Sequence, residues 1–440
     1  MKYELKLGDN AETLKQYPDN HFDSIVTDPP YGIEFMGKDW DKHTGALETW
    51  NECFRVLKPG GHILAFSASR TYHHLATNIE SVGFEIRDQI MWLYGSGFPK
   101  SMNIGKAVDK KLGNKRKFVG QNQDIIKKQA KDLREGKRKI LDSFKAGEPN
   151  RNNGFKTVSA DITKGNTEWE GWGTALKPAH EPIVMARKPL SEKTIVDNVL
   201  KHGTGGINID ECRVGTDEKL SIGSNNRKNA NVNFGMKNDK KKQKQNEQGR
   251  FPANIIHDGS EEVLEGFPET GKSAGGRSYQ NTNKMYEGGW DGGEGSKIDP
   301  GFGDSGSAAR FFYCPKANKK ERNAGCEDME GEVRFASTNE SGKMLPSKLN
   351  EPHKVKGNYH PTVKPVALMK YLITLITPKG GKVLDPFNGS GSTGMACVEL
   401  GYEYTGCELD PDYIEISKAR IEAWYAENKP EEVNEYFDKI

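Results

Sequence analysis

The sequence predicts an α/β protein with a doubly wound, mostly parallel, Rossmann-like sheet that is assembled from both ends of the chain. First, short apolar strands alternate with amphipathic helices in two blocks, residues 1–99 and 359–428. Second, the residues between these blocks show only short strand signals among Gly, Asn, Ser and Lys, which indicates a central insertion and a small irregular domain. Third, two predicted strands end in the motifs TDPPYG and DPFNGSG, at the edge where such sheets bind ligands.

Apolar periodicity in the first block predicts strands and helices in alternation. The predicted strands lie near Tyr3–Leu7, Asp23–Thr27, His62–Phe66 and Glu85–Tyr94, and the predicted helices run from Ala11, over 45–57 and over 70–81. The helix over 45–57 carries Trp50, Phe54 and Leu57 on one face. This alternation is typical of a parallel sheet covered by helices.

The second block begins with a helix, because Pro365 suits a first helical position and Leu368, Leu372 and Ile376 form an apolar face. A βαβ unit follows, with a strand at Lys382–Leu384, a glycine turn, a helix to Leu400, a strand at Tyr404–Glu408 and a helix from Pro411. One more strand, EPIVMARKP from Glu181, lies between the blocks. The sheet therefore needs strands from both ends of the chain.

Charge is unevenly distributed along the 440 residues, although the net charge is only +2. Residues 106–156 contain 16 Lys and Arg against 6 Asp and Glu, and a second basic run, KNDKKKQKQ, begins at Lys237. Such runs fit a phosphate backbone, and they are equally typical of a solvated insertion. Charge alone therefore leaves a nucleic-acid partner open.

Membrane and metal-binding classes are not indicated. The chain starts without a basic-then-apolar signal pattern and has no apolar run of about 18 residues, so a cytoplasmic protein with no membrane partner is expected. The six cysteines form no C-x-x-C pair and the histidines have no ligand spacing. We therefore predict buried, reduced thiols and no metal site.

Gly389, Gly391 and Gly394 form a G-x-G-x-x-G pattern after an apolar strand, and Glu408 follows Gly389 by 19 positions. This pattern is typical of dinucleotide sites, where the loop binds a pyrophosphate. Asp385 stands just before the glycines and would repel phosphates, and no Lys-Ser or Lys-Thr follows them as in a P-loop. The motif therefore favours a cationic ligand.

The motif SIVTDPPYG ends a strand rich in β-branched residues with Asp28. Pro29 and Pro30 restrict the backbone, so that a carboxylate and neighbouring carbonyls are held at a fixed angle. These acceptors suit an amino group on a planar base, and Tyr31 offers a ring on which the base can stack. A rigid turn with a helix-capping Asp28 is the alternative without chemistry.

DPPYG and VLDPFNGSGSTG together resemble the motifs of the amino-methylating DNA methyltransferases, which methylate N6 of adenine or N4 of cytosine with S-adenosyl-L-methionine. Their order resembles the permuted subclass, in which DPPY comes first, a target-recognition region follows and the cofactor loop comes last. Other similar segments, as in phage and prophage members, are GGHILAF from Gly60, GSGFPKS from Gly95, GWGTALKPAHEPIVMARKP from Gly171, SAARFFYCPKANKKER from Ser307 and HPTVKP from His360. The resemblance covers both blocks and the middle only in patches.

This resemblance implies a site residue by residue. Asp28, Pro29, Pro30 and Tyr31 would form the catalytic motif. Asp385 would face the ammonium group of S-adenosyl-L-methionine, and Glu408 would accept both ribose hydroxyls. The other implied cofactor-binding residues are Asp9 near the adenine, Thr362 and Lys364 beside the methionine part, and Phe387, Asn388, Gly389, Ser390 and Gly391 in the loop.

The implied reaction is direct methyl transfer to an exocyclic amine. That nitrogen is a poor nucleophile because its lone pair is delocalised into the ring. Hydrogen bonds from both N–H groups to the Asp28 carboxylate and a Pro29 carbonyl would turn the lone pair towards the methyl group. The base must leave the duplex stack to reach these acceptors, with Tyr31 stacking on it.

Several substrates and partners fit this implied reaction. Methylation of cytosine C5 is disfavoured because the chain has no Pro-Cys pair, and family usage of DPPY favours adenine N6 over N4 of cytosine. N4-cytosine methylation and an inactive DNA-binding protein on the same fold remain alternatives. The basic middle favours double-stranded DNA over RNA or protein amines. A homodimer is left open, and no restriction endonuclease partner is identified.

The predicted domain organisation follows from these motifs. Residues 1–99 form the catalytic half of the methyltransferase domain, 100–170 a basic insertion that contacts DNA, and 171–190 a further strand. Residues 191–358 form the target-recognition domain, 359–428 the cofactor-binding half and 429–440 a tail.

Overall fold

A computed structural model describes ten segments of the chain, which are residues 2–33, 41, 43–97, 101–123, 126–127, 161–215, 249–271, 305–315, 320–333 and 353–428. The chain divides into two compact units. The larger unit comprises Met1–Ser96 and Ala179–Ile440, and the smaller one comprises Gly97–Pro178. Each unit is described by itself below.

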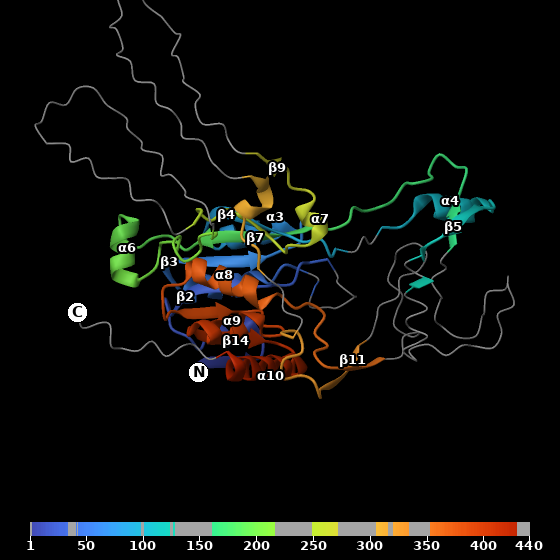
Figure 1. Ribbon diagram of the computed structural model, residues 1–440. Coiled ribbons are helices and arrows are strands. Elements are labelled where there is room, and N and C mark those ends of the chain that lie inside the picture. Colours follow the sequence, from blue (N-terminus) through green and yellow to red (C-terminus); the bar gives the residue numbers. More distant parts are fainter. Residues whose placement is uncertain are drawn as a thin grey trace, which may run out of the picture. The chain divides into compact units, whose positions relative to one another are not determined.

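An eight-stranded sheet forms the centre of the larger unit, in the order β1-β14-β13-β2-β3-β7-β4-β8 (Figure 1). Its strands are β1 (Tyr3–Leu7), β14 (Glu403–Glu408), β13 (Lys382–Asp385), β2 (Phe22–Thr27), β3 (Leu57–Phe66), β7 (His180–Arg187), β4 (Glu85–Leu93) and β8 (Ile255–His257). β7 runs antiparallel to both of its neighbours, and the other neighbouring strands pair in parallel. The predicted doubly wound, Rossmann-like α/β class is confirmed.

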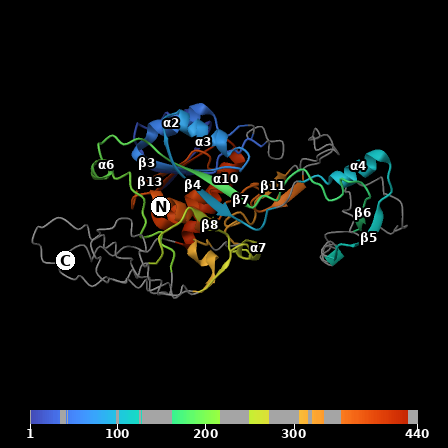
Figure 2. The same cartoon turned by 90° about the horizontal axis from the view of Figure 1, so that it is seen from above.

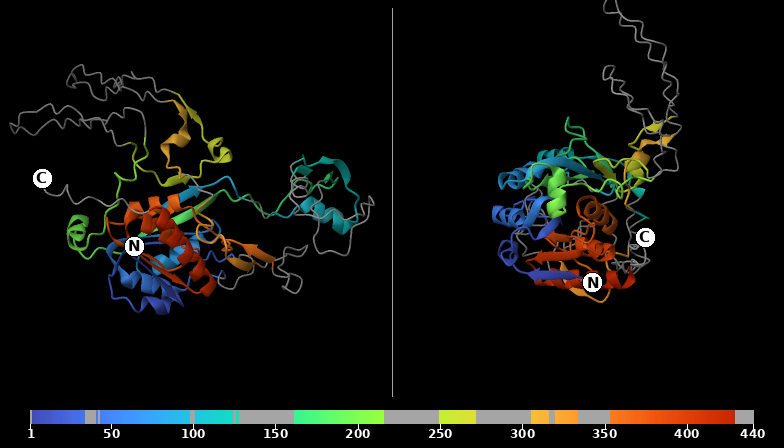
Figure 3. Two further views of the ribbon diagram at one scale, coloured as in Figure 1. Left: turned by 60° about the horizontal axis from the view of Figure 1, so that its bottom comes forward. Right: turned by 90° about the vertical axis from the view of Figure 1, so that its left-hand side faces the viewer.

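Helices from the two sequence blocks cover opposite faces of the sheet (Figures 2 and 3). Ile25 and Ile63 of the central strands pack with α1 (Asn10–Leu14), α2 (Leu47–Val56) and α3 (Tyr72–Ser81). Val26 and Leu64, one residue further along, pack on the other side with α8 (Val366–Ile376), α9 (Ser392–Leu400) and α10 (Pro411–Glu427). Successive strand residues point to opposite faces, so two apolar layers require strands that are apolar throughout.

Local signals explain most element boundaries. Asp9 caps α1 by accepting from the amides of Ala11 and Glu12, and Asp410 caps α10, which has Pro411 in its first turn. β3 starts at Leu57, five residues before the predicted start at His62. The Lys-Pro-Gly-Gly stretch resembles a turn in composition but continues the strand, and Leu57 in front of it pairs with Phe22. The predicted strands and helices of both blocks otherwise agree closely with those of the structure.

Parts of the middle region belong to the larger unit. β8 extends the sheet beside β4, and α6 (Ile195–His202) packs against β3. The other elements are α7 (Glu261–Leu264), β9 (Glu269–Thr270), β10 (Gly306–Ser307), the 3₁₀ helix η3 (Ala308–Phe311), β11 (Glu330–Val333) and β12 (His353–Lys356). The base-reading role of 191–358 stays a prediction, since its described parts partly serve the sheet.

Arg420 connects the middle region to the second block. Its guanidinium is fully buried and donates to the carbonyls of Glu321 and Ser390 and to the hydroxyl of Ser392. Burial lowers the pKa of Arg420 to about 10. One side chain of α10 thereby holds residue 321 against the glycine loop.

The smaller unit contains part of the basic insertion. Helix α4 (Ile104–Leu112) ends at Gly113 in the left-handed conformation, and β5 (Lys117–Gln121) pairs antiparallel with β6 (Asp161–Lys164). Arg116 connects α4 with β6, because it forms an ion pair with Asp109 and donates to the hydroxyl and carbonyl of Thr163. It also forms an ion pair with Glu170. The insertion is therefore built on a small folded framework.

Several predicted features lie outside the described residues. They are the tail 429–440, the basic run from Lys237 and most of the basic insertion after residue 127. Five of the six cysteines are buried as predicted, but the side chain of Cys314 is exposed. Among the described residues, no helix is long and apolar enough to cross a membrane.

Replacing Arg420 tests the connection through α10. Arg420→Leu leaves the buried carbonyls of Glu321 and Ser390 without these donors, so we expect the free energy of unfolding to fall by about 2–5 kcal/mol. Urea denaturation measures this loss. Lys418→Met alters an exposed neighbour on the same helix and should change the stability by less than about 0.5 kcal/mol. Equal effects of both variants would contradict the assignment.

Candidate active site

Three predicted site residues meet at one edge of the sheet because their strands are neighbours. β14, β13 and β2 lie side by side and run parallel, so their carboxyl ends meet. Glu408 and Asp385 end β14 and β13, and Asp28 follows the end of β2. This is the edge at which open α/β sheets bind ligands.

Asp385 is held at the centre of this edge and is only 2% exposed. Its Oδ1 accepts from the Thr27 hydroxyl at 2.6 Å and from the Phe387 amide at 3.1 Å, and its Oδ2 accepts from the Thr393 hydroxyl at 2.7 Å. Burial raises the pKa of Asp385 to about 6, despite these three donors. The carboxyl group therefore connects the end of β2 with the glycine loop.

Both oxygens of Asp28 accept hydrogen bonds. Lys364 Nζ lies 2.6 Å from Oδ2, and the Tyr31 hydroxyl donates to Oδ1 at 2.8 Å. The ammonium group of Lys364 thus binds the carboxylate of the DPPY motif, and its place beside the methionine part of the cofactor stays a prediction. Burial lowers the pKa of Lys364, but the nearby carboxylates together raise it further, so its pKa lies above the usual lysine value.

Glu181 is a second carboxylate beside Asp28 that the sequence reasoning missed. It lies near the start of β7, whose antiparallel direction brings this end to the carboxyl edge of the parallel strands. Its Oε2 lies 3.3 Å from Lys364 Nζ and 3.1 Å from the Tyr31 hydroxyl. The only signal in the sequence is an acid at the start of an otherwise apolar strand.

Asp41 is another residue that the motif analysis missed, and it supports the DPPYG turn. Its side chain is 1% exposed. Its Oδ1 accepts from the amides of Tyr31 at 2.6 Å and Gly32 at 3.0 Å, and its Oδ2 accepts from the Ile33 amide at 3.3 Å. The turn is therefore positioned by a carboxylate as well as by its two prolines.

The glycine loop requires glycine at two of the predicted positions. Gly389 and Gly391 have φ values of +52° and +77°. A Cβ on Gly391 would lie 2.5 Å from the Ser417 hydroxyl oxygen, and one on Gly389 would lie 3.1 Å from Nε2 of His360. Glu408 Oε2 accepts from the Gly389 amide at 2.8 Å, so the loop is tied to the end of β14.

The other predicted cofactor residues differ in their exposure. The side chains of Asn388 and Ser390 are only 4% exposed, and the Asn388 Oδ1 accepts from Tyr404 and Ser417. Phe387 packs against Trp50 with ring centroids 5.6 Å apart. Thr362 is exposed. Asp9 lies two residues after the end of β1, whose last residue, Leu7, pairs with Glu408. Asn388 therefore stabilises the glycine loop from its buried side, and Phe387 connects the loop to α2 through its contact with Trp50.

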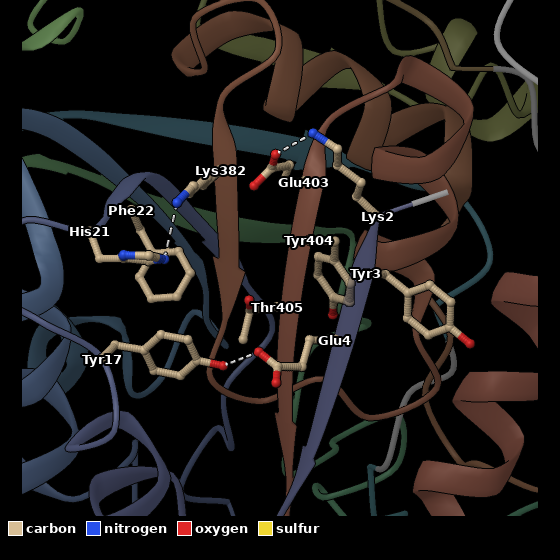
Figure 4. Close-up of a pocket in the computed structure, with 10 residues that line it drawn as sticks. All are labelled: Lys2, Tyr3, Glu4, Tyr17, His21, Phe22, Lys382, Glu403, Tyr404 and Thr405. Carbon is tan, nitrogen blue, oxygen red and sulfur yellow. Dashed lines mark hydrogen bonds and ion pairs between the residues drawn. The ribbon is translucent and has the colours of Figure 1, made fainter.

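A pocket of about 330 Å³ lies elsewhere, at the opposite edge, where the parallel strands begin (Figure 4). Tyr17 donates to Glu4 across it, and Lys2 forms an ion pair with Glu403. Neither the DPPYG turn nor the glycine loop lines this pocket. Among the described residues, no cluster of His, Cys, Asp or Glu could hold a metal ion.

The arrangement at the carboxyl edge can bind a cation and an amine side by side. Asp385 and Glu408 supply negative charge at the glycine loop, and Asp28 supplies acceptors for N–H donors one strand away. A sequence model of the N6/N4 DNA methylases matches residues 22–419. The chain belongs to the N6/N4 DNA methylase family. The DPPYG and DPFNGSG motifs lie near opposite ends of the matched region. The parallel pairing of β2 with β13 brings them together in the fold.

Individual relatives match only parts of this methylase. It is 43% identical to the Type II methyltransferase M2.MboI of Moraxella bovis over 81 residues, which are 18% of this chain and 28% of that protein. It is 41% identical to the Type II methyltransferase M2.DpnII of Streptococcus pneumoniae over 64 residues, 14% of this chain and 24% of that protein. The matched segments span about a quarter of these curated relatives.

A solved structure with weak similarity is the PvuII DNA methyltransferase, described as cytosine-N4-specific. It is 13% identical with a TM-score of 0.41, over 96% of this chain and 86% of that chain. A similarity at this level carries no inference about the activity of this chain.

Replacing Asp41 tests the support of the DPPYG turn. Asp41→Ala removes the acceptor for three amides, so we expect faster hydrogen exchange at Tyr31, Gly32 and Ile33 and a loss of about 1–3 kcal/mol in unfolding free energy. Amide exchange followed by mass spectrometry measures the first effect. Asp41→Asn keeps one acceptor oxygen and should give an intermediate result. Unchanged exchange in Asp41→Ala would contradict the role.

Asp385 gives the protein a specific pH dependence. Its pKa is raised in the folded state, so the folded protein binds more protons than the unfolded chain between about pH 4 and pH 6. Ionisation of Asp385 therefore lowers the free energy of unfolding progressively as the pH rises through this window. At higher pH the loss keeps its full value. As the pH rises from about 5 to about 7, the free energy of unfolding of Asp385→Asn should increase by about 1 kcal/mol relative to that of the wild type.

Urea denaturation of both proteins at several pH values measures that difference. Comparing the two cancels the other titrating groups. A stability difference that does not change with pH would show that Asp385 titrates as an ordinary exposed carboxyl group.

Proposed function

We propose that this methylase transfers a methyl group from S-adenosyl-L-methionine to N6 of adenine in double-stranded DNA. The observation that carries the proposal is the pair of donors on Asp28, the Lys364 ammonium and the Tyr31 hydroxyl. An exocyclic amino group presents N–H donors of the same kind. A carboxylate that already accepts from a buried ammonium group is suited to accept from a target amine.

The glycine loop fits S-adenosyl-L-methionine better than a nucleotide phosphate. Two carboxyl groups, Asp385 and Glu408, adjoin the loop, and burial raises the pKa of both. The cationic side chain at the loop, Arg420, is directed to carbonyl and hydroxyl oxygens and is fully buried. The cofactor supplies a methyl group on a cationic sulfur. Glu408, Asp385 and Phe387 are proposed to bind and orient it.

The chain's own part in the transfer is to position and activate the amine. Asp28 accepts a hydrogen bond from the amino group, and its negative charge stabilises the positive charge that develops on nitrogen as the N–C bond forms and the sulfur–methyl bond breaks. The methylated nitrogen then becomes neutral by losing one proton to solvent. Tyr31 and the two prolines define the angle at which the base is held. The Asp41 contacts keep this turn in place before the base arrives.

Double-stranded DNA is the proposed partner because the chain carries a concentrated basic region. Residues 106–156 contain 16 basic against 6 acidic side chains. Within the described part of the smaller unit, Lys106, Lys111, Lys115 and Lys117 are exposed. Such side chains bind phosphates without reading sequence, and the reaction additionally needs a base that leaves the stack.

The proposal of adenine rests on the Asp in DPPY, which the family uses more often for adenine. N4-cytosine methylation by the same site is the second candidate, because both amines are chemically alike at Asp28. An inactive DNA-binding protein is the third. The complete set of Asp28, Lys364, Tyr31 and Asp385 contacts favours an active enzyme over it.

Asp28→Ala tests the proposed chemistry. We expect methyl transfer to DNA to fall by about 1,000-fold or more, since the acceptor in the transition state is lost, while the affinity for S-adenosyl-L-methionine changes little. Transfer of a labelled methyl group and calorimetry measure the two quantities. Asp19→Ala changes an exposed carboxylate on the same unit and should leave both unchanged.

The identity of the product decides between the candidates. DNA incubated with the protein and S-adenosyl-L-methionine is digested to nucleosides and examined by mass spectrometry. N6-methyladenine supports the proposal, and N4-methylcytosine replaces it with the second candidate. Neither product, together with normal DNA binding, leads to the third.

A further inference from the structure

The proposed base site holds two charged groups, Glu181 and Lys364, besides the Asp28 carboxylate that direct transfer uses. Asp28, Tyr31, Glu181 and Lys364 form a cluster in which the Lys364 ammonium lies 2.6 Å from Asp28, 3.3 Å from Glu181 and 3.1 Å from the Tyr31 hydroxyl oxygen. Three acceptors surround the three N–H donors of the ammonium group. In this arrangement both oxygens of Asp28 are in use.

An amino group that reaches either oxygen of Asp28 therefore competes with the donor that is already held there. The target amine is neutral, whereas Lys364 is a cation, so the exchange replaces a charged donor with a weaker one. Lys364 is 8% exposed, and its Nζ lies 4.9 Å from the ring centre of Phe66 and 5.4 Å from that of Tyr31. It is enclosed by rings and cannot exchange Asp28 for bulk water. An ammonium group left there without a carboxylate would be strongly destabilised.

Glu181 removes this obstacle because it already contacts both displaced donors. Its Oε2 lies within 3.3 Å of the ammonium nitrogen and within 3.1 Å of the Tyr31 hydroxyl oxygen. The hydroxyl has one proton and can donate to Asp28 or to Glu181, but not fully to both. A small shift of the two donors towards Glu181 frees Asp28 and keeps the buried cation paired.

The backbone around Glu181 is suited to this task. The backbone of Glu181 pairs with Trp92 of β4, and the pairing of β7 with β3 begins two residues later at Ile183, so Glu181 lies at a position that β4 holds in register. The Glu181 side chain is 20% exposed, and that of Asp28 is 21% exposed. Lys364 thus lies deeper than either of its carboxylate partners, and the carboxylates can be reached from outside.

We propose that Glu181 is a positioning residue of the active site, which holds Lys364 and the Tyr31 hydroxyl when the target amine takes their place on Asp28. This inference rests on the proposed function and adds a residue to it. Glu181 does not touch the reacting atoms. It acts through Lys364, and its effect belongs to the step after DNA has bound.

Glu181→Gln tests the role, because glutamine keeps the shape and one acceptor oxygen but loses the charge. Lys364 should then remain on Asp28 and compete with the amine, so we expect the single-turnover rate of methyl transfer to fall by about 10- to 100-fold. The affinities for DNA and for S-adenosyl-L-methionine should change by less than about twofold, because the loss follows binding. Rapid-quench assays and equilibrium titrations measure these quantities.

Glu85→Gln is the matched control. Glu85 also faces a cation of β7, since it lies 2.7 Å from Arg187, but this pair is at the other end of the strand. The control should leave the transfer rate unchanged. A loss in Glu85→Gln equal to that in Glu181→Gln would mean that removal of any carboxylate from the β4–β7 strand pair has the same effect, and it would overturn the proposal.

The Lys364→Met background separates positioning from a general structural effect. Without the cation Glu181 holds only the Tyr31 hydroxyl, to which glutamine still offers an acceptor oxygen, so adding Glu181→Gln should change the remaining rate by less than about twofold. If Lys364→Met has no measurable rate, the free energies of unfolding of the wild type, both single variants and the double variant are compared instead. Glu181→Gln should then destabilise the wild type and stabilise Lys364→Met, in which two carboxylates lack their cation.

Two further outcomes are distinct. A wild-type rate in Glu181→Gln overturns the role of Glu181 and leaves the proposed function standing. A wild-type protein that methylates no DNA overturns the proposed function and this inference with it.

Discussion

The hydrogen bond from the Thr27 hydroxyl to Asp385 is the contact on which the site depends. It spans 2.6 Å in space and 358 residues in sequence. It exists because β2 and β13 pair in parallel, so the end of an early strand meets the end of a late one. Asp385 also binds the Thr393 hydroxyl at the start of α9, so one buried carboxyl group fixes the DPPYG turn relative to the glycine loop. The distance between the two proposed reactants follows from this contact.

Negative charge dominates the carboxyl edge of the sheet. Asp28, Glu181, Asp385 and Glu408 all lie there, and Lys364 is the cation that pairs with two of them. Burial raises the pKa of Asp385 and of Glu408, so the folded protein pays for holding these groups. A cationic ligand at the glycine loop lowers that cost. The charges at this edge therefore agree with a cationic methyl donor.

Side-chain partners were harder to predict than positions. The motif residues Asp28, Asp385 and Glu408 were expected at strand ends and are found there. The expected place of Lys364 beside the cofactor stays a prediction, and its contacts with Asp28 and Glu181 come from segments far away in the sequence, so no local pattern predicts them. Asp41 and Glu181 escaped notice because neither belongs to a repeated spacing. Their roles arise from three amides and from one ammonium group contributed by other segments.

The sequence by itself determined the layered α/β class, the order of strands and helices in both blocks, and the two turn motifs, because periodicity and turn residues are local properties. Tertiary structure alone decided that β14, β13 and β2 are neighbours, that antiparallel β7 carries Glu181 to the reactive edge, and that Arg420 ties residue 321 to the glycine loop. These outcomes depend on which distant apolar faces pack together. No local pattern in the chain contains that information.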